Sequence, residues 1–355
     1  MKNIFLTIGK LDRGGAEMRI LKLIKDLNFL NAEVQFIIYV ISGKEGSLTK
    51  DFLENHNVNI IYGRPGISGL HLFYKTICSL DIDILHLNSS MAAGIYAFLG
   101  KLAKVPNIYA HIRTSEHYGS GFYYHLKQSF FAFLMNNFCN KVIGVCEGSQ
   151  KLSKTSSAKW ITIYNGVDLV NKIDPTYNKY SMICIGRQNP AKNHLFMVDV
   201  LAKLVDMYPD YPWKLDFYGR EDEILKKELE NRISMYGLKK YISLCGETKN
   251  PLETISNYHI LVLPSIREGL PGTVLEALSV GVNSVVSNLP GCVEIKKYVE
   301  CLEVVDDFSI ENWVSSIKKI CSENDNSRAI IKDYLKESPF TNIEHVNNIR
   351  KLWEV

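Results

Sequence analysis

The sequence Glu268-Gly-Leu-Pro-Gly-Thr-Val-Leu-Glu276-Ala277 follows the apolar run His259-Ile-Leu-Val-Leu-Pro264. The run is short enough to be a buried strand. The Gly/Pro-rich turn that follows opens into an apolar helix. A strand, a loop and a helix in this order place side chains at the carboxyl edge of a parallel sheet, where ligands bind. The stretch therefore predicts a ligand site on an α/β sheet.

The two glutamates have two interpretations. Thr273 and Glu276 have the Thr-x-x-Glu spacing of a capping box, in which the glutamate only satisfies backbone amides at the helix start. Glu268 is then an exposed loop carboxylate. In the other interpretation both glutamates hold a phosphorylated, hydroxyl-rich ligand, and a Thr273 cap fixes the helix while Glu276 projects toward that ligand.

The composition indicates a globular protein of two domains. The chain has 355 residues, of which 46% are hydrophobic and 22% charged, and single cores of this length usually split. A net charge of +3 is too weakly basic to indicate nucleic acid as a partner. It is compatible with an anionic ligand or with transient contact with an anionic membrane face.

The cysteines and the first residues indicate a cytoplasmic protein. None of the eight cysteines forms a C-x-x-C pair, and Cys184 and Cys245 lie in apolar runs typical of buried free thiols in a reducing compartment. The first residues lack the apolar segment and cleavage site of a signal peptide. No window is long enough to span a bilayer, so we expect a soluble chain, with peripheral contact at the inner face of the membrane as an option.

Strand-like runs alternate with helical stretches in both halves of the chain, which predicts two parallel sheets covered by helices. The predicted fold is α/β, with two doubly wound Rossmann-like domains facing across a cleft. We expect an N-terminal domain over 1–168, a linker over 169–180, a C-terminal domain over 181–340, and a terminal helix over 341–355 able to pack back on the first domain. Strands are predicted at 3–8, 34–41, 58–62, 82–87, 107–111, 141–145, 181–185, 214–218, 241–245, 259–263 and 283–287, and helices at 193–207, 221–236 and 273–280.

Two loops carry groups suited to a phosphorylated ligand. Gly14 and Gly15 precede the first helix, where glycines let the backbone approach a ligand and the helix N-terminus favours an anion; a plain tight turn is the alternative. Arg187 and Lys192 bracket a turn between a strand and a helix, offering a planar fork and a point charge for a diphosphate. Their alternative is a pair of solvated surface cations. Because no G-x-G-x-x-G pattern is present, NAD binding is not indicated.

Two further groups stand at strand ends. His111 ends a first-domain strand, where it either exchanges a hydrogen bond with a sugar hydroxyl or is structural. Asp81 and Asp83 have the D-x-D spacing of some metal sites, but they begin a strand and so lie at the edge of the sheet opposite the ligands. We therefore expect no metal site there.

These pieces together resemble the retaining glycosyltransferases of family 4, which have the GT-B fold. The resemblance covers nearly the whole chain in order. It rests on Gly14-Gly15-Ala16-Glu17, the strand ending at His111, Asn165-Gly166-Val167-Asp168, Gly186-Arg187-x4-Lys192-Asn193, Leu244-Cys-Gly246, Leu263-Pro-Ser265, Glu268-Gly-Leu-Pro-x4-Glu276-Ala277 and Gly281-Val-Asn-Ser-Val-Val-Ser. Gly281-Val-Asn-Ser-Val-Val lacks a common proline, Gly291 lacks a paired glycine, and Leu270 replaces a frequent phenylalanine; these departures bear on which sugar fits.

The resemblance implies a metal-independent, hexosyl-type transferase that uses a nucleotide-diphosphate sugar as donor substrate and no cofactor. A UDP-sugar is expected over a GDP-sugar, with a glycan or lipid-linked glycan of surface polysaccharide or lipopolysaccharide as acceptor. Front-face attack assisted by the diphosphate would retain the anomeric configuration. The implied catalytic residues are Glu268, beside the transferred sugar, and His111, on the acceptor side. Among the implied donor-binding residues, Arg187 and Lys192 would bind the diphosphate and Glu276 would bind the ribose. The backbone of Leu270, Pro271, Gly272 and Thr273 would contact sugar and phosphate. Gly14 and Gly15 would let the first domain close over the donor.

Two alternatives and one further surface remain open. A nucleotide-sugar epimerase of the same fold and a non-catalytic sugar- or nucleotide-binding protein are the other functions compatible with these residues. The aromatic-rich stretch 121–135 is either a helix that touches a membrane or a helix packed on the sheet, with Phe130, Phe133 and Leu134 in the core.

Overall fold

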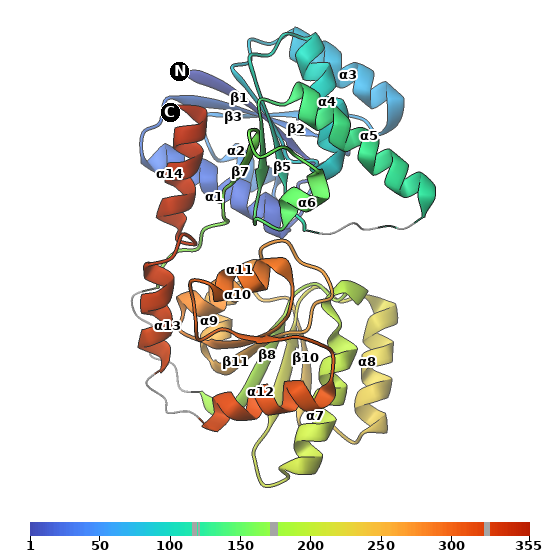
Figure 1. Ribbon diagram of the computed structural model, residues 1–355, viewed down its shortest axis with the longest axis vertical. Helices are drawn as coiled ribbons and strands as arrows, with labels where there is room; N and C mark the ends of the chain where they lie inside the picture. The colour runs from blue at the N-terminus through green and yellow to red at the C-terminus, as the bar shows by residue number, and fades with distance from the viewer. Residues whose placement is uncertain (116–118, 120, 171–176, 323–326) are drawn as a thin grey trace. The chain divides into compact units, whose positions relative to one another are not determined.

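The computed structural model describes residues 1–115, 119, 121–170, 177–322 and 327–355. The chain divides into two compact units (Figure 1). Unit 1 contains Met1–Asn165 together with Ile343–Val355, and unit 2 contains Gly166–Asn342.

The described part of unit 1 contains a seven-stranded parallel sheet of order β3-β2-β1-β4-β5-β6-β7. Its strands are β1 (Lys2–Ile8), β2 (Val34–Val40), β3 (Val58–Tyr62), β4 (Ile84–Leu87), β5 (Asn107–Ile112), β6 (Lys141–Gly144) and β7 (Trp160–Thr162). Its helices are α1 (Gly15–Phe29), α2 (Thr49–Leu53), α3 (Gly66–Cys78), η1 (Ser90–Ala92), α4 (Ala93–Leu102), α5 (Phe122–Phe138), α6 (Ser149–Ser153) and α14 (Asn342–Trp353).

Both faces of this sheet are buried, as a doubly wound domain requires. Ile4, Leu6 and Ile8 of β1 pack with residues of α1, α2 and α14 on one face. Phe5, between them in the sequence, points to the other face and packs with residues of α3, α4 and α5. Successive residues of a strand point to opposite faces, so this near-continuous apolar strand feeds two cores.

Unit 2 has, in its described part, a six-stranded parallel sheet of order β10-β9-β8-β11-β12-β13. Its strands are β8 (Asn178–Ile185), β9 (Lys214–Tyr218), β10 (Ile242–Gly246), β11 (Tyr258–Leu263), β12 (Asn283–Ser287) and β13 (Glu303–Val305). Its helices are η2 (Pro190–Lys192), α7 (His194–Met207), α8 (Glu223–Met235), α9 (Pro251–Ser256), α10 (Gly272–Ser279), α11 (Pro290–Lys296), α12 (Ile310–Ser322) and α13 (Ser327–Lys336).

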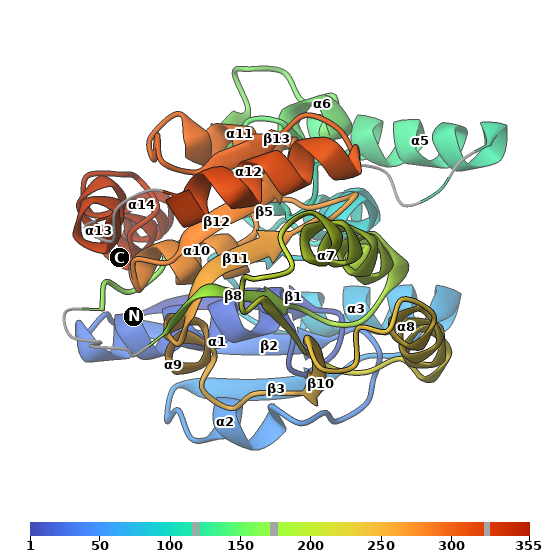
Figure 2. The same ribbon diagram turned by 90° about the horizontal axis from the view of Figure 1, so that it is seen from below.

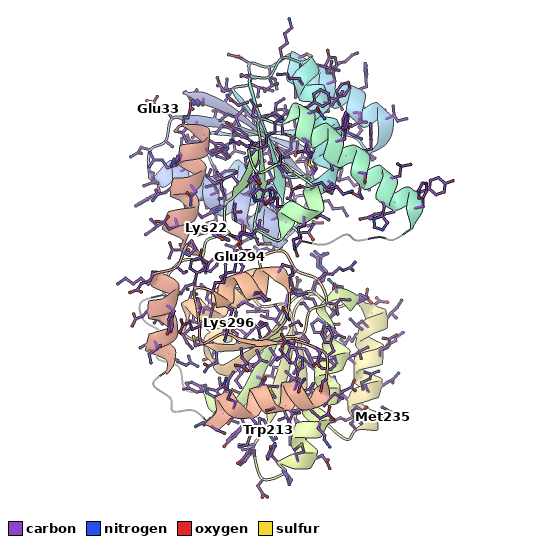
Figure 3. The ribbon with its side chains drawn as sticks, viewed as in Figure 1. Lys22, Glu33, Trp213, Met235, Glu294 and Lys296 are labelled. Atoms are coloured by element: carbon purple, nitrogen blue, oxygen red, sulfur yellow. The ribbon has the colours of Figure 1, made fainter. Side chains whose placement is uncertain are left out.

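Helices cover the sheet of unit 2 on both faces (Figure 2). Residues of α7, α8 and α12 form one core with Met182 and Cys184 of β8, and Trp213, labelled in Figure 3, is buried among them. On the other side of the sheet, α10 packs against α9 and α13.

Each sheet has one switch point, where the chain changes the direction in which it adds strands. In unit 1 the strands added after β1 run outward through β2 and β3, and the chain then returns to place β4 on the other side of β1. Unit 2 repeats this arrangement with β8 between β9 and β11. Loops diverge at the carboxyl ends of such strand pairs and leave a crevice in which ligands bind. We therefore expect ligand-binding residues at the carboxyl ends of β1 and β4 in unit 1, and of β8 and β11 in unit 2.

The predicted α/β fold with two doubly wound parallel sheets is confirmed. All eleven predicted strands are present, although β4 starts at Ile84 rather than at residue 82. The short strands β7 and β13 were not predicted, and neither were the helices α9, α11, α12 and α13 of unit 2. Strands of three residues are too short to show a hydrophobic period.

The segments that connect the units run side by side at the start and end of unit 2. Val167 forms an isolated parallel bridge with Thr341, and its amide donates to the carbonyl of Phe340 (2.9 Å). Residues 171–176 of the linker predicted at 169–180 lie outside the described residues, and β8 begins within that range, at Asn178.

The cysteines that the structure describes are free thiols, and five of them are buried. Cys184 is one of these, and burial raises its pKa to about 12. The prediction for Cys245 was wrong, because this residue is exposed near the end of β10, at the edge of the sheet.

Candidate active site

The loop after β8 is shaped around Lys192. A Cβ at Gly186 would lie 3.1 Å from Cε of Lys192, so the glycine gives the lysine stem room to fold back over the strand end. Asn189 caps the short helix η2 by accepting a hydrogen bond from the Lys192 amide (3.2 Å). Arg187 is exposed, and no hydrogen bond or ion pair of its guanidinium occurs among the described residues. Arg187 and Lys192 thus lie on one loop at the switch point of unit 2.

The loop after β11 supplies the partner of Lys192. Lys192 Nζ lies 2.6 Å from Oε1 of Glu268, and both side chains are largely buried, with 19% and 15% of their surfaces exposed. Ser265, fully buried, donates its hydroxyl to the same oxygen (2.7 Å). The amide of Ile266 also donates to the carbonyl of Ala191 (2.8 Å). The two loops are therefore joined both by backbone and by a hydrogen-bonded ion pair.

This arrangement leaves groups for a ligand. An ammonium has three donors, and the carboxylate of Glu268 occupies one of those on Lys192. The cluster can bind phosphate oxygens with Lys192 while Glu268 stays fixed by Ser265.

Helix α10 starts differently from the capping box predicted for it. Its N-cap residue is Pro271, Gly272 is the first helical residue, and no side chain caps the helix. Thr273 lies inside the first turn, and its hydroxyl is buried without a hydrogen-bond partner among the described residues. The Thr273 cap was wrong because proline fixes the backbone angle φ that a helix entry needs and so moves the start by two residues.

The remaining predicted residues of this loop lie around that helix start. Leu270 and Pro271 are buried, and Glu276 is half-buried on α10. A Cβ at Gly291, in the first turn of α11, would fall 1.9 Å from the carbonyl oxygen of Gly269. Close contact of α11 with the backbone at 269–270 thus holds the loop that carries Glu268, and it needs a glycine at 291.

In unit 1, Gly14 and Gly15 lie at the start of α1, beyond the carboxyl end of β1. Gly14 is the N-cap residue, and a Cβ there would meet the carboxylate of Glu17. A Cβ at Gly15 would meet no atom within 4 Å. Gly15 therefore faces open space, while Gly14 makes room for Glu17.

His111 is buried near the end of β5 and belongs to a chain of three rings. Its Nδ1 lies 3.1 Å from Nε2 of His86 on β4. Nδ1 of His86 accepts a hydrogen bond from Nε1 of Trp353 on α14 (3.2 Å). All three residues are at most 2% exposed. His111 Nε2 is buried and has no partner among the described residues.

Arg113 is a charged residue that affects the pKa values of His86 and His111. Asn88, after β4, accepts hydrogen bonds from Nη2 (2.9 Å) and Nε (3.2 Å) of Arg113. Burial and, secondly, the charge of Arg19 lower the pKa of Arg113 to about 10, against the opposing effect of the Glu17 carboxylate. Burial, with a smaller contribution from Arg113, also lowers the pKa of His86 to about 3 and that of His111 well below its ordinary value. Both imidazoles are therefore neutral at pH 7.

Asp81 and Asp83 take part in structural hydrogen bonds. Asp83 accepts from the Asn3 amide (2.7 Å), and the carbonyl of Asp81 accepts from the Asn3 side chain (2.9 Å). These bonds fasten the amino ends of β1 and β4, at the edge of the sheet opposite the site. Over the described ranges, no group of three His, Cys, Asp or Glu residues is placed to hold a metal ion.

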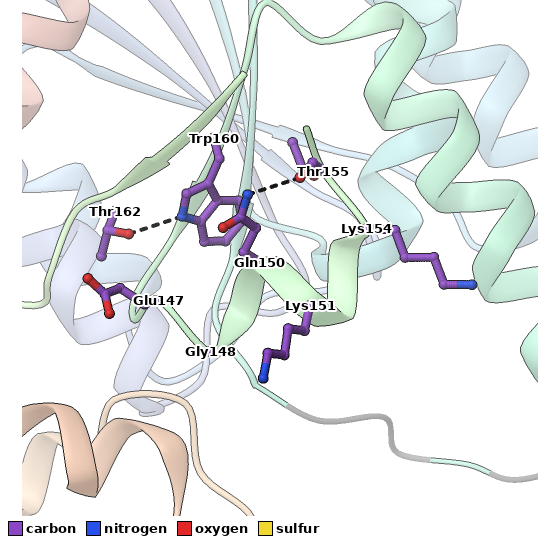
Figure 4. A pocket seen from close by; sticks show the side chains of 8 residues that line it. All are labelled: Glu147, Gly148, Gln150, Lys151, Lys154, Thr155, Trp160 and Thr162. Carbon is purple, nitrogen blue, oxygen red and sulfur yellow. Dashed lines mark hydrogen bonds between the residues drawn. The ribbon is translucent and has the colours of Figure 1, made fainter. Parts of the chain in front are cut away.

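A pocket of ≈ 770 Å³ lies in unit 1 around α6 and β7 and contains none of the predicted site residues (Figure 4). The Trp160 indole in its wall donates to Thr162 (3.0 Å), and Gln150 donates to the carbonyl of Thr155 (3.1 Å). The full lining is Glu147, Gly148, Gln150, Lys151, Lys154, Thr155, Trp160 and Thr162.

Helix α5 combines a buried face with an exposed apolar one. Leu134 is buried as the core interpretation expected, but Phe130 and Phe133 are 53% and 60% exposed, so that interpretation was wrong for them. Phe131 and Met135 take their place in the core. None of the described helices is long and apolar enough to span a membrane.

Four residues of these clusters were missed in the sequence. Ser265 was quoted within a motif but given no role, although its spacing of three from Glu268 was a signal. His86 lies in the predicted strand 82–87, and the structure places it in β4 directly beside Tyr109 of β5, two residues before His111. Arg113 follows the predicted strand 107–111 by two residues but was given no role. Trp353 had no local signal, because its role depends on a contact with a residue 267 positions away.

Comparisons with known proteins agree with this geometry. Residues 170–337 match the family described as "Glycosyl transferases group 1". The chain is 28% identical over 332 residues, 91% of each chain, to the capsular polysaccharide biosynthesis glycosyltransferase CapH of Staphylococcus aureus. It is 23% identical over 330 residues, 81% of each chain, to an Escherichia coli enzyme named UDP-Gal:alpha-D-GlcNAc-diphosphoundecaprenol alpha-1,3-galactosyltransferase.

Among solved structures, Anabaena HepE in complex with UDP and glucose superposes with a TM-score of 0.82, at 17% identity, over 100% of this chain and 99% of that one. The fold is GT-B, with two parallel-sheet Rossmann-like domains. Together with the family match and the relatives in sequence, it supports a glycosyltransferase.

Proposed function

We propose that the protein transfers a hexosyl unit from a UDP-sugar to a glycan or lipid-linked glycan, with retention of the anomeric configuration, as a family 4 enzyme in surface polysaccharide assembly. The cluster of Lys192, Glu268 and Ser265 at the switch point of unit 2 carries this proposal. The names of the relatives support the substrate classes, because one acts on UDP-galactose and a diphosphoundecaprenol-linked sugar and HepE binds UDP.

Each residue of unit 2 has a proposed role. Arg187 and Lys192 bind the diphosphate, whose charge grows as it leaves, so stabilisation of that charge accelerates the reaction. Glu276 accepts hydrogen bonds from the ribose hydroxyls, and the backbone of Leu270, Pro271, Gly272 and Thr273 contacts phosphate and sugar. Glu268, fixed by Ser265 and Lys192, lies beside the transferred sugar.

The transfer step needs no metal and no protein nucleophile. The bond from the anomeric carbon to the diphosphate oxygen breaks, and a bond from the same carbon to the acceptor oxygen forms on the same face. The acceptor proton passes to the leaving diphosphate oxygen, so atoms and charge balance. Gly14, Gly15 and His111 of unit 1 contribute to donor closure and to the acceptor side.

The acceptor brings the enzyme to a lipid surface in this proposal. The exposed apolar face of α5 contains Phe122, Tyr123, Leu126, Phe130 and Phe133, between 53% and 85% exposed. Lys127 lies on the same helix, with its ammonium 5.5 Å from the centre of the Phe131 ring. Aromatic and apolar side chains with a nearby cation are typical of helices that lie in a membrane interface rich in anionic lipids.

The test is a transfer assay with purified protein, a panel of UDP- and GDP-sugars and a diphosphopolyprenyl-linked sugar as acceptor. We expect release of UDP only with acceptor present, product with the donor's anomeric configuration by NMR, and full activity in a metal chelator. Arg187→Ala and Lys192→Ala should each lower the rate roughly 100-fold or more, because each removes a charge that stabilises the leaving group. Lys203→Ala is the matched control, since Lys203 forms a mostly exposed ion pair with Asp206 elsewhere in unit 2.

Two outcomes would contradict the proposal. Conversion of the nucleotide sugar into its epimer, with no acceptor consumed, would favour an epimerase. Tight binding of UDP without any turnover across the panel of sugars and acceptors would favour a non-catalytic binding protein.

A further inference from the structure

The ring chain in unit 1 contains one group whose hydrogen-bonding role is fixed by chemistry. The Trp353 indole N–H can only donate. Since it lies 3.2 Å from Nδ1 of His86, that nitrogen must carry a lone pair and no proton. A neutral His86 then carries its proton on Nε2, the nitrogen that faces His111.

The same argument applies to Nδ1 of His111. Nε2–H of His86 donates to Nδ1 of His111 across 3.1 Å, so Nδ1 of His111 must be the acceptor. Two N–H groups cannot face each other at this distance, which excludes a proton on Nδ1. The proton of a neutral His111 is therefore on Nε2.

That N–H has no partner among the described residues, although it is buried. Leaving a buried donor unpaired costs about 1–3 kcal/mol, so such groups in native proteins call for an explanation. Two other orphaned polar atoms, the side-chain nitrogen of Asn88 and the hydroxyl of Ser89, follow the neighbouring strand β4. All three lie near the carboxyl ends of β4 and β5, the edge at which ligands bind.

We propose that Trp353 and His86 are positioning residues that hold His111 in the tautomer with its proton on Nε2, so that His111 donates a hydrogen bond to an oxygen of the sugar substrate. The assignment of the ligand rests on the proposed function; the tautomer rests on the ring geometry alone. His111 is then a donor and not the base that takes the acceptor proton, in agreement with transfer of that proton to the diphosphate. These hydrogen bonds between the three rings require both histidines to be uncharged. Burial and Arg113 keep them uncharged by lowering the pKa of each.

The direct test is nitrogen NMR of the full chain labelled with ¹⁵N-histidine at neutral pH, with His111 assigned from the spectrum of His111→Gln. We expect the Nδ1 resonance of His111 in the range of an unprotonated, hydrogen-bonded nitrogen and its Nε2 resonance in the range of a protonated one. A protonated Nδ1 in the unaltered protein would overturn the proposal.

Trp353→Phe removes the N–H and keeps an aromatic ring in the core. We expect part of the His111 population to move its proton to Nδ1, and kcat/KM to fall roughly fivefold, the value of one hydrogen bond. Trp313→Phe is the matched control, because Trp313 is another fully buried tryptophan that donates one hydrogen bond, to the Asp307 carbonyl in unit 2 (2.9 Å). It should leave the His111 resonances in place.

A pair of substitutions at His86 separates the hydrogen bond from packing. His86→Gln keeps an N–H donor near the position of Nε2 and should preserve the His111 tautomer and most of the activity. His86→Leu fills the space without a donor. As in Trp353→Phe, part of the His111 population should then move its proton to Nδ1. Equal spectra and equal rates for Trp353→Phe, His86→Leu and the unaltered protein would overturn the proposal.

Failure of the proposed function gives a different pattern. If the resonances shift as expected but the unaltered protein consumes no nucleotide sugar, the tautomer assignment stands and the glycosyltransferase proposal is lost. If the unaltered protein is active and Trp353→Phe changes neither spectrum nor rate, the positioning role is lost and the function stands.

Discussion

At the scale of single residues, buried imidazoles respond most strongly to their surroundings. His194, the first residue of α7, is 1% exposed, and neither of its ring nitrogens has a partner among the described residues. Burial and, secondly, the charge of Lys192 lower its pKa to about 4. The positive end of the α7 dipole acts in the same direction. The ring is kept neutral in the folded protein and takes up a proton on unfolding in mild acid.

His194 therefore makes unit 2 sensitive to acid. Between its unfolded pKa of about 6.5 and its folded pKa of about 4, the unfolded chain binds the extra proton, so stability falls as pH falls through this window. We expect His194 alone to lower the free energy of unfolding by about 2 kcal/mol between pH 7 and pH 5. His194→Phe should abolish this part of the loss in stability. Urea titrations at the two pH values, followed by fluorescence, measure it.

The control for this prediction is His71→Gln, since His71 is exposed on α3 in unit 1. This variant should keep the full loss of unit 2 stability in acid. An unchanged pH dependence in His194→Phe would show that another group is responsible.

At the scale of elements, α11 positions the loop that carries Glu268. Alanine is a better helix former than glycine, so Gly291→Ala on an isolated helix would be stabilising. In this protein the added Cβ would fall 1.9 Å from the Gly269 carbonyl oxygen, and backbone must move. Packing between elements therefore opposes local propensity at this position.

We expect Gly291→Ala to destabilise unit 2 by about 1–3 kcal/mol, the usual cost of overpacking, and to weaken UDP binding by displacing the Glu268 loop. Calorimetric titration with UDP and urea unfolding measure the two effects. Gly15→Ala, also in the first turn of a helix but with no atom within 4 Å of its Cβ, should leave stability nearly unchanged. Equal stabilities of the two variants would contradict this account.

Helix α5 gives a second prediction at this scale. Leu126, Phe130 and Phe133 share one face because they are spaced by four and three residues. The double variant Leu126→Asp/Phe130→Asp should bind vesicles containing anionic phospholipids at least roughly tenfold more weakly in flotation assays, since two large apolar contacts are lost. Ile67→Asp, at an 87% exposed position of α3, should bind as the unaltered protein does. Equal binding by both variants would exclude α5 as the contact.

At the scale of the whole molecule, the two units have separate cores. The apolar clusters of unit 1 draw on residues before 165 and after 342, and the large cluster of unit 2 contains only residues between them. The four tryptophans divide equally, with Trp160 and Trp353 in unit 1 and Trp213 and Trp313 in unit 2. Each pair can therefore report on its own unit.

A ligand bound by unit 2 should stabilise unit 2 more than unit 1. In the variant Trp160→Phe/Trp353→Phe, the remaining tryptophans report on unit 2, and UDP at 100 times its dissociation constant should raise the free energy of unfolding by about 2.7 kcal/mol. In Trp213→Phe/Trp313→Phe, which reports on unit 1, the shift should be smaller. No stabilisation of unit 2 under saturating UDP would contradict the donor site proposed here.

Local sequence patterns were enough to predict the alternation of strands and helices, the position of the Arg187–Lys192 loop and that of the Glu268–Glu276 loop. Apolar periods and Gly/Pro punctuation are local, so they can be recognised without knowing which strands are neighbours. The same local reasoning failed at Thr273, where Pro271 took the cap position, and it missed β7 and β13, which are too short to show a period.

Which side chains come into contact could not be predicted from these local patterns and became known from the folded structure. The ion pair of Lys192 with Glu268 spans 76 positions, and the bond from Trp353 to His86 spans 267. The ion pair depends on strand order, which places β8 beside β11. The bond from Trp353 depends on the packing of α14 in the core of unit 1. Strand order follows from how the whole chain buries its apolar surface, and no short stretch of sequence contains that information.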